Sequence, residues 1–146
     1  MSFFKFFSKK QSTEQLKWSE VGQSAEGKVL SPAYIHNGIV YTAGSLGTDP
    51  KDPSSIPSTI EEQTHFALQN LETVLKASGA SLDSCLKLLV FIKDPADQKR
   101  MNAVYSKYMK TQPARSCVVV GFPDQRVLVE IEAVAVQVGQ KVKAKL

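Results

Sequence analysis

Three charged side chains interrupt two apolar, β-branched runs near the end of the sequence. Arg115 lies in the run at 114–120, and Glu130 and Glu132 lie in the run at 127–138. Burial of an ion without a partner costs roughly several kcal/mol, so charges in core strands are paired or kept for a ligand. An arginine binds a carboxylate through two hydrogen bonds, and a nearby glutamate can hold a water molecule or move a proton. We therefore predict that Arg115 and Glu130 form a site for a small 2-oxo or 2-imino acid.

A structural ion pair is the alternative interpretation, because such pairs account for many charges inside proteins. Side chains alternate along a strand, so Arg115 and Cys117 share one face of their strand, and Glu130 and Glu132 share one face of theirs. Whether these two faces coincide depends on strand register, which the sequence leaves open.

Other polar residues lie near the arginine in the sequence. Cys117 is either a thiol activated by the Arg115 cation or a small buried hydrophobic residue. Asn102 and Tyr105 are one helical turn apart, just before the arginine strand. Tyr105 is expected to pack in the core, whereas Asn102 is expected to hydrogen-bond a ligand or to fix the loop.

The arginine and glutamate runs flank a Gly-Phe-Pro-Asp break at 121–124 and are predicted as two buried strands joined through a turn. Upstream, 33–36 and 39–43 flank Asn37-Gly38, the dipeptide typical of a two-residue hairpin turn. A short edge strand is expected around 18–21. The segment 44–58 contains three prolines and is predicted as a loop.

Two helices are predicted between these strands. Ser58-Thr59-Ile60-Glu61 has the form of a capping box, and Gly79 can end the helix that follows. One face of that helix is predicted to hold Ile60, Thr64, Ala67, Leu68, Leu71, Val74, Leu75 and Ser78. An apolar run at 86–92 is predicted as a strand covered on both faces. Asp94-Pro95 would cap a second helix, whose inner stripe would comprise Met101, Val104, Tyr105 and Tyr108.

The order hairpin, helix, strand, helix, strand, strand predicts an α+β fold, with two helices on one face of a mixed, mostly antiparallel sheet. The last two strands have apolar side chains on both faces. The sheet face away from the helices must therefore also be covered. Copies of the same chain are the simplest cover, so we expect a homo-oligomer.

The chain has 146 residues, enough for one domain with its own core. Its net charge is +4, but three lysines lie near each end; without these six, residues 11–140 carry a charge of −2. The basic balance therefore describes the tails and indicates no nucleic-acid surface. Two cysteines in apolar runs indicate buried thiols in a reducing compartment.

Neither histidine has a second histidine or cysteine at ligand spacing, so no metal is expected. The sequence also contains no phosphate-binding glycine loop and no serine elbow.

The first twelve residues are acid-poor, and their apolar run is too short to span a membrane. A targeting peptide, a surface anchor and a frayed tail all stay open as interpretations of this segment. We expect an extension, partly flexible, over 1–26, a folded domain over 27–140, and a basic tail over 141–146.

Two short runs, PARSCV at 113–118 and EIEA at 130–133, place Glu130 fifteen residues after Arg115. Together they resemble the two-part signature of the YjgF/YER057c/UK114 family, also called the RidA or reactive-intermediate deaminase family. The likeness extends through Asn102–Tyr105 and Val40–Gly44 and covers roughly residues 27–138. It implies a chorismate-mutase-like α+β fold and a homotrimer with clefts between subunits, and no cofactor is expected. It also implies hydrolysis of enamines and imines such as 2-aminoacrylate (2-iminopropanoate) and 2-iminobutanoate. From the two thiols and the acid-poor N-terminal sequence we expect a cytoplasmic or mitochondrial protein.

The resemblance assigns roles to single residues. Arg115 would bind the substrate carboxylate, and Glu130 would position or activate the attacking water. The backbone at Cys117 would lie against the ligand, Asn102 would support the cleft, and Ser45 would belong to the substrate-binding set. The resemblance also implies that the strand at 86–92 neighbours the arginine strand, so that the last two strands need not pair.

Three departures from the family pattern bear on activity. The family tyrosine that touches substrate is replaced by Leu30, its Ser-Gly-Gln run by Ala43-Gly44-Ser45, and its Leu-Pro turn by Gly121-Phe122-Pro123. Loss of the tyrosine hydroxyl motivates a second hypothesis, a cleft that binds a small carboxylate and regulates a partner without turnover. A ribonuclease or translation inhibitor is less favoured, because the −2 core lacks basic residues interleaved with aromatic ones.

Overall fold

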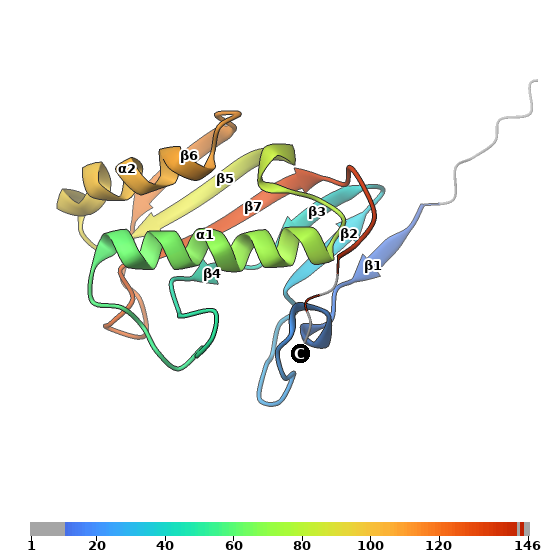
Figure 1. Ribbon diagram of the computed structural model, residues 1–146, viewed down its shortest axis with the longest axis horizontal. Coiled ribbons are helices and arrows are strands. Elements are labelled where there is room, and N and C mark those ends of the chain that lie inside the picture. The colour runs from blue at the N-terminus through green and yellow to red at the C-terminus, as the bar shows by residue number, and fades with distance from the viewer. Residues whose placement is uncertain (1–10, 143, 145–146) are drawn as a thin grey trace, which may run out of the picture.

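The computed structural model describes residues 11–142 and 144, and these residues form a sheet with helices packed on one face (Figure 1). Within this part of the chain the strand order is β1-β2-β3-β7-β5-β6, and β4 also pairs with β7. β5 and β6 are parallel and the other pairs are antiparallel. The predicted α+β architecture is therefore confirmed. The strands are β1 (Thr13–Gln15), β2 (Ala33–His36), β3 (Ile39–Thr42), β4 (Ser45–Leu46), β5 (Cys85–Ile92), β6 (Ala114–Val119) and β7 (Val129–Val136).

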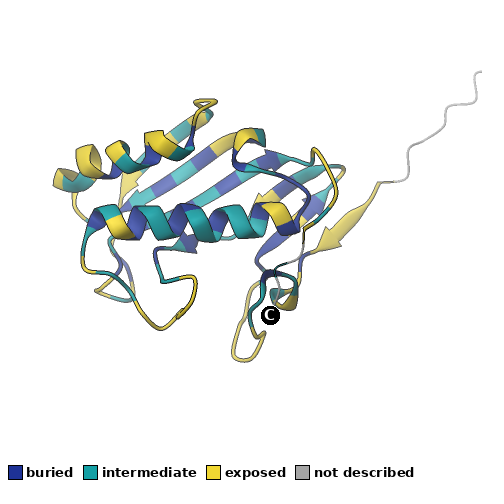
Figure 2. Ribbon diagram, viewed as in Figure 1, coloured by how far each residue is buried: buried dark blue, intermediate teal, exposed yellow. Residues whose placement is uncertain are grey.

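The central strand is β7, and its sequence alternates between two environments. Its residues Val129, Ile131, Ala133 and Ala135 are buried, whereas those between them are half-buried. Figure 2 shows this alternation as dark and lighter bands along the sheet. Since successive side chains point to opposite faces, the buried set faces the helices and Glu130 and Glu132 face the other side.

The helix α1 (Ile60–Ala77) lies across the sheet and supplies much of the core. Leu68, Leu71 and Leu75 are fully buried, and burial of a leucine is worth about 1.5–3 kcal/mol. The predicted inner face is confirmed, with Val74 at its half-buried border. The predicted capping box is displaced by one residue: the N-cap is Thr59, whose Oγ1 accepts from the Glu62 amide and donates to the Glu62 carboxylate.

The parallel strands β5 and β6 are joined by α2 (Gln98–Tyr108). β5 lies between β6 and β7, so the break at 121–124 does not form a hairpin between neighbouring strands. Asp94 caps the short 3₁₀ helix Pro95–Asp97 that leads into α2, rather than α2 itself. Another 3₁₀ helix, Leu82–Ser84, precedes β5.

The β2–β3 hairpin forms at the predicted dipeptide, where Asn37 and Gly38 have φ of 50° and 81°. The following segment is a loop apart from β4. The expected edge strand at 18–21 is wrong: Trp18–Val21 is a 3₁₀ helix, in which the Glu20 carboxylate accepts from the Lys17 amide and Gly22 ends the turn with φ of 73°. The strand in this region is β1, which pairs with β2.

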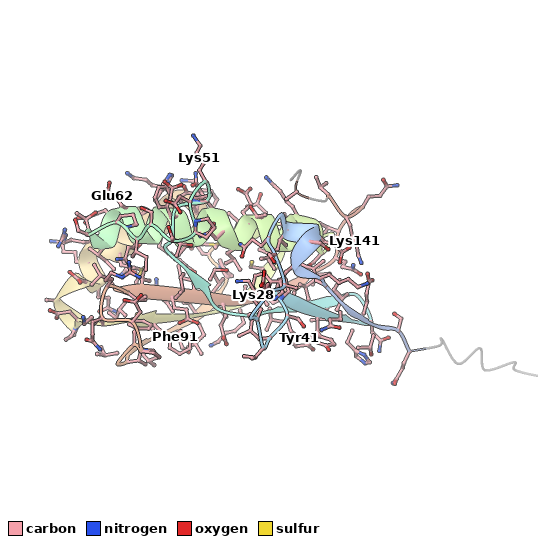
Figure 3. All side chains as sticks on the ribbon, turned by 90° about the horizontal axis from the view of Figure 1, so that it is seen from below. Lys28, Tyr41, Lys51, Glu62, Phe91 and Lys141 are labelled. Atoms are coloured by element: carbon pink, nitrogen blue, oxygen red, sulfur yellow. The ribbon has the colours of Figure 1, made fainter. Side chains whose placement is uncertain are left out.

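Within the described part of the chain, no element covers the sheet face opposite the helices. Tyr34, Tyr41 and Val118 are 47%, 49% and 41% exposed, and Figure 3 shows Tyr41 and Phe91 pointing away from the helix layer. The expectation that β5 is covered on both faces is therefore wrong for one chain, because Leu86 is half exposed and the helices cover only one side of the sheet. Among the described helices, none is long and apolar enough to cross a membrane.

Candidate functional site

Arg115 lies on the edge strand β6, on the helix face of the sheet. It pairs with Leu88, which is fully buried under the helices, and paired residues of neighbouring strands share a face. Its Nη1 donates to Asn102 Oδ1 at 2.7 Å, and its guanidinium carbon lies 4.7 Å from the centre of the Tyr105 ring. No carboxylate of the described residues forms an ion pair with it. Most of the guanidinium N–H donors are thus available to a ligand.

A hollow opens beside this guanidinium at the C-terminal end of α2. Its lining includes Arg115, Tyr105, Met109, Lys110 and Pro113. Gln112, which also lines it, has φ of 51°, so the loop turns sharply between α2 and β6. The hollow gives a small anion access to the free edge of Arg115.

Cys117 shares the helix face of β6 with Arg115, because it pairs with the buried Val90. It is a half-buried free thiol that packs against the core. The other cysteine, Cys85, is buried, and burial raises the pKa of its thiol to about 11. Cys85 is therefore the inert buried thiol that the sequence predicted.

Glu130 lies on the open face of the sheet, where it pairs with Phe91 on one side and Leu46 on the other. Its carboxylate rests against Gly44: a Cβ on that glycine would lie 1.7 Å from Glu130 Oε1. Burial raises the pKa of the Glu130 carboxyl, and the negative charge of Glu132 raises it further. Neither glutamate side chain has a hydrogen bond or ion pair with a described residue, so the carboxylate of Glu130 is available to water or a ligand.

Ser45 lies where β4 pairs with β7, on the side of the buried Ile131, and is itself buried. It lines a second hollow between β4, α1 and the N-terminal segment, together with Gly44, Lys28 and Trp18. The Lys28 ammonium lies 4.2 Å from the centre of the Trp18 ring, so the N-terminal segment forms part of this wall.

The predicted site residues thus form two separate groups in one chain. Arg115, Asn102 and Cys117, which we name the arginine group, lie at the α2–β6 edge. Glu130 and Ser45, the glutamate group, lie where β4 meets β7, with the Ser45 side chain on the helix face and the Glu130 side chain on the open face. Strand β5 separates the two, and Arg115 and Glu130 point to opposite faces of the sheet. The alternative of an Arg115–Glu130 ion pair within one chain is therefore excluded.

Two contacts in these groups could not be predicted from the sequence patterns. The sequence places Asn102 and Tyr105 one helical turn apart, but this spacing cannot show that the tyrosine ring lies against the guanidinium. The contact of Gly44 with Glu130 depends on the short strand β4, which lies inside a segment predicted as loop.

The two histidines serve local contacts. His36 Nδ1 lies 2.7 Å from Thr13 Oγ1, across the β1–β2 pair, and His65 Nδ1 is hydrogen-bonded to the Tyr108 hydroxyl between the two helices. Within residues 11–142 and 144, no group of three or more ligating side chains is placed to hold a metal ion.

In the described part of the chain, a mixed sheet carries two helices on one face, an arginine without an acidic partner at its edge, and two glutamates without basic partners on its open face; this architecture defines an α+β protein. The same class emerges from comparison with known proteins. Residues 24–137 match the family model described as endoribonuclease L-PSP. The chain is 37% identical over 106 residues to a RutC family protein of Pyrococcus horikoshii, covering 72% of this chain and 84% of the relative. It is 36% identical over 106 residues to the chloroplastic Reactive Intermediate Deaminase A of Arabidopsis thaliana, covering 72% of this chain and 57% of the relative.

Solved structures give the same result. The crystal structure of Escherichia coli TdcF with bound serine superposes with a TM-score of 0.76 at 29% identity, covering 86% of this chain and all of the other. The chain therefore belongs to the endoribonuclease L-PSP family, also known as the YjgF/YER057c/UK114 or RidA family, as the resemblance predicted.

Proposed function

We propose that this protein hydrolyses small 2-imino acids and their enamines, such as 2-iminobutanoate and 2-iminopropanoate (2-aminoacrylate), to 2-oxo acids and ammonia. The observation that carries the proposal is the state of Arg115. Its cation has one neutral acceptor, Asn102, and no acidic partner among the described residues, and it borders an open hollow. A half-buried guanidinium held in this way is suited to bind the carboxylate that every such substrate contains.

The reaction needs a water molecule and two proton transfers. Arg115 would hold the carboxylate, while the Glu130 carboxylate would accept a proton as water adds to the imine carbon. Glu130 would return this proton to the nitrogen, which gives a carbinolamine with an amino group. The carbinolamine hydroxyl would then pass its own proton through Glu130 to the amino group, so that the C–N bond breaks, ammonia leaves, and the carbonyl of the 2-oxo acid forms. The raised pKa of Glu130 moves this group toward neutral pH, where a carboxyl exchanges protons most effectively. The Cys117 backbone and Ser45 would contact the ligand, and no cofactor takes part.

Because Arg115 and Glu130 point to opposite faces of the sheet, we propose that the cleft forms between chains. The arginine group of one subunit would meet the glutamate group of the next in a homotrimer. Two features support this assembly: β6 is an edge strand with no partner on one side among the described strands, and the open sheet face exposes large apolar side chains.

The experiment that tests the activity couples the protein to a threonine dehydratase and follows the release of 2-oxobutanoate. Wild-type protein is expected to accelerate the release, and Arg115→Ala is expected to reduce the acceleration by roughly a hundredfold or more, because the carboxylate loses its anchor. Arg126→Ala is the matched control, since Arg126 is an exposed arginine whose guanidinium, among the described residues, pairs with Asp124 alone. Release that wild-type protein does not accelerate would contradict the proposal.

A regulator that binds a small carboxylate without turnover is the second candidate. It is favoured by Leu30, which stands where the family has a tyrosine and is 55% exposed, with its carbonyl fixed by the Trp18 Nε1–H. Binding of 2-oxobutanoate in calorimetry without any acceleration in the dehydratase assay would support this candidate. A ribonuclease or translation inhibitor stays less favoured, because residues 11–140 carry a charge of −2.

The division into an extension over 1–26, a domain over 27–140 and a tail over 141–146 also stays a proposal, supported by a family match over 24–137. The expected flexibility of the extension and the basic tail fall largely on residues 1–10, 143 and 145–146, which lie outside the described residues. We propose a cytoplasmic or mitochondrial location from the two cysteines in apolar runs and the acid-poor N-terminal sequence.

A further inference from the structure

Two residues of α2 hold the Arg115 guanidinium in different ways. Asn102 accepts one hydrogen bond from Nη1 in the plane of the guanidinium, at 2.7 Å. Tyr105, one helical turn later, presents the face of its ring to the guanidinium carbon at 4.7 Å. A cation over an aromatic face at this distance is attracted by the ring quadrupole.

The hydroxyl of Tyr105 takes no part in this contact. The residue is only 8% exposed, and its Oη is buried without any hydrogen-bond partner among the described residues. A buried hydroxyl without a partner costs free energy, so the hydroxyl does not account for a tyrosine at this position. Burial also raises the pKa of Tyr105, although the Arg115 cation opposes the shift, and the ring stays neutral.

A neutral ring is a suitable support for an arginine that must bind an anion. A protein carboxylate in this place would occupy the N–H edge of the guanidinium and cancel its charge. The ring face instead contacts the guanidinium from above its plane, so the in-plane N–H donors and the full charge remain available. The hollow beside Arg115 is lined by the same tyrosine, which places the supporting ring and the free donors next to each other.

We propose that Tyr105 is a positioning residue that orients the guanidinium of Arg115 through its ring face and not through its hydroxyl. The inference rests on the proposed function, in which Arg115 binds the substrate carboxylate. Without the ring, the long arginine side chain samples more rotamers and loses entropy when the carboxylate binds. The ring therefore contributes to affinity for the carboxylate while touching no reacting atom.

Three variants of Tyr105 test the inference by NMR of the Arg115 side chain. The protons near the guanidinium should show an upfield ring-current shift in wild type and in Tyr105→Phe, which keeps the ring and removes only the unpartnered hydroxyl. Tyr105→Leu and Tyr105→Met should lose the shift. Methionine serves as a second ringless variant because it fills irregular core space, should the leucine variant fail to fold.

Calorimetry with 2-oxobutanoate on the same proteins gives the functional readout. We expect Tyr105→Phe to bind like wild type, and Tyr105→Leu and Tyr105→Met to bind roughly three- to thirtyfold more weakly. In the dehydratase assay their KM should rise with kcat little changed. The matched control is Tyr108→Phe on the same helix, which breaks the hydrogen bond to His65 and should lower stability without changing carboxylate affinity.

Unchanged Arg115 signals in both ringless variants would overturn the inference, as would a loss of the shift or of affinity in Tyr105→Phe. A wild-type protein that binds no 2-oxobutanoate would count against the proposed function instead. The Arg115 signals would still decide whether the ring holds the guanidinium, so the two failures are distinguishable.

Discussion

Arg115 and Glu130 are each left without a partner of opposite charge within the described part of one chain. Arg115 contacts a neutral amide and a neutral ring, and Glu130 rests against the Cα of Gly44. Arg115 keeps its charge at little cost, because its side chain is only half-buried and still partly hydrated. The charge of Glu130 is more costly, because burial and the nearby negative charge of Glu132 both raise the pKa of its carboxyl. At this scale the chemistry depends on small contacts, such as the absence of a methyl group at residue 44.

Gly44→Ala should move the Glu130 carboxylate. The new methyl group would lie 1.7 Å from Oε1, 2.6 Å from Cδ and 2.8 Å from Cγ of Glu130, and all three belong to a flexible side chain. The carboxylate can swing away, so the stability should fall by only about 1 kcal/mol or less. The rate in the dehydratase assay should fall roughly ten- to a hundredfold, because a general base must lie within reach of its water.

The control for this change is Gly121→Ala, whose added Cβ meets nothing within 4 Å and whose φ is not positive. This variant should match wild type in both stability and rate. A normal rate in Gly44→Ala would show that the position of the Glu130 carboxylate does not limit the reaction.

The elements are joined by a buried glutamine of α1. Gln63 is fully buried; its Nε2 donates to the carbonyls of Pro57 and Arg126, and its Oε1 accepts from the amide of Leu128. These bonds tie the start of α1 to the loop before it and to the chain entering β7. The side chain thereby replaces the hydrogen bonds that the irregular backbone cannot make with itself.

Gln63→Leu should lower the free energy of unfolding by roughly 2–4 kcal/mol, because it removes three hydrogen bonds and leaves backbone groups without partners. Urea denaturation measures the change. Gln69→Leu on the same helix is the control: that side chain makes no hydrogen bond with a described residue, so its loss should cost about 0.5 kcal/mol or less. Equal losses in the two variants would refute a bridging role for Gln63.

At the scale of the whole molecule, the two faces of the sheet differ in how far they are covered. Helices cover one face, while the other exposes Tyr34 and Tyr41 and carries the unpaired Glu130 and Glu132. An apolar sheet face of this kind is costly in water, and its charged residues lack partners within the described chain. Contact between copies of the chain would bury the apolar face and give its charged residues partners. It would also bring the arginine group of one chain to the glutamate group of another.

Tyr41→Glu should therefore weaken the assembly. In analytical ultracentrifugation the wild-type protein is expected to have three times the 16.0 kDa mass of one chain, and the variant the mass of a monomer. The variant should also lack activity, because each proposed cleft needs two subunits. Lys51→Glu adds the same negative side chain on the opposite side of the molecule (Figure 3) and should leave the trimer intact. A monomeric, active wild-type protein would contradict the proposed cleft.

Periodicity and turn chemistry alone determined most of the fold. The alternation of β7, the apolar stripe of α1 and the Asn37-Gly38 turn are local patterns, and each forms the predicted element because neighbouring residues decide it. The shifted helix cap and the 3₁₀ helix at Trp18–Val21 differ because several residues there can satisfy the same amides, and only their competition selects one.

The sequence also identifies the candidate site residues, because an arginine and a glutamate stand out in apolar strands. Only the tertiary structure decided where their side chains point, because a shift of one residue in register moves every side chain to the other face of the sheet. The placement of β5 between β6 and β7 separates Arg115 from Glu130, and the packing of α2 brings Tyr105 beneath the guanidinium. Both follow from contacts between residues far apart in the chain, which local sequence patterns do not encode.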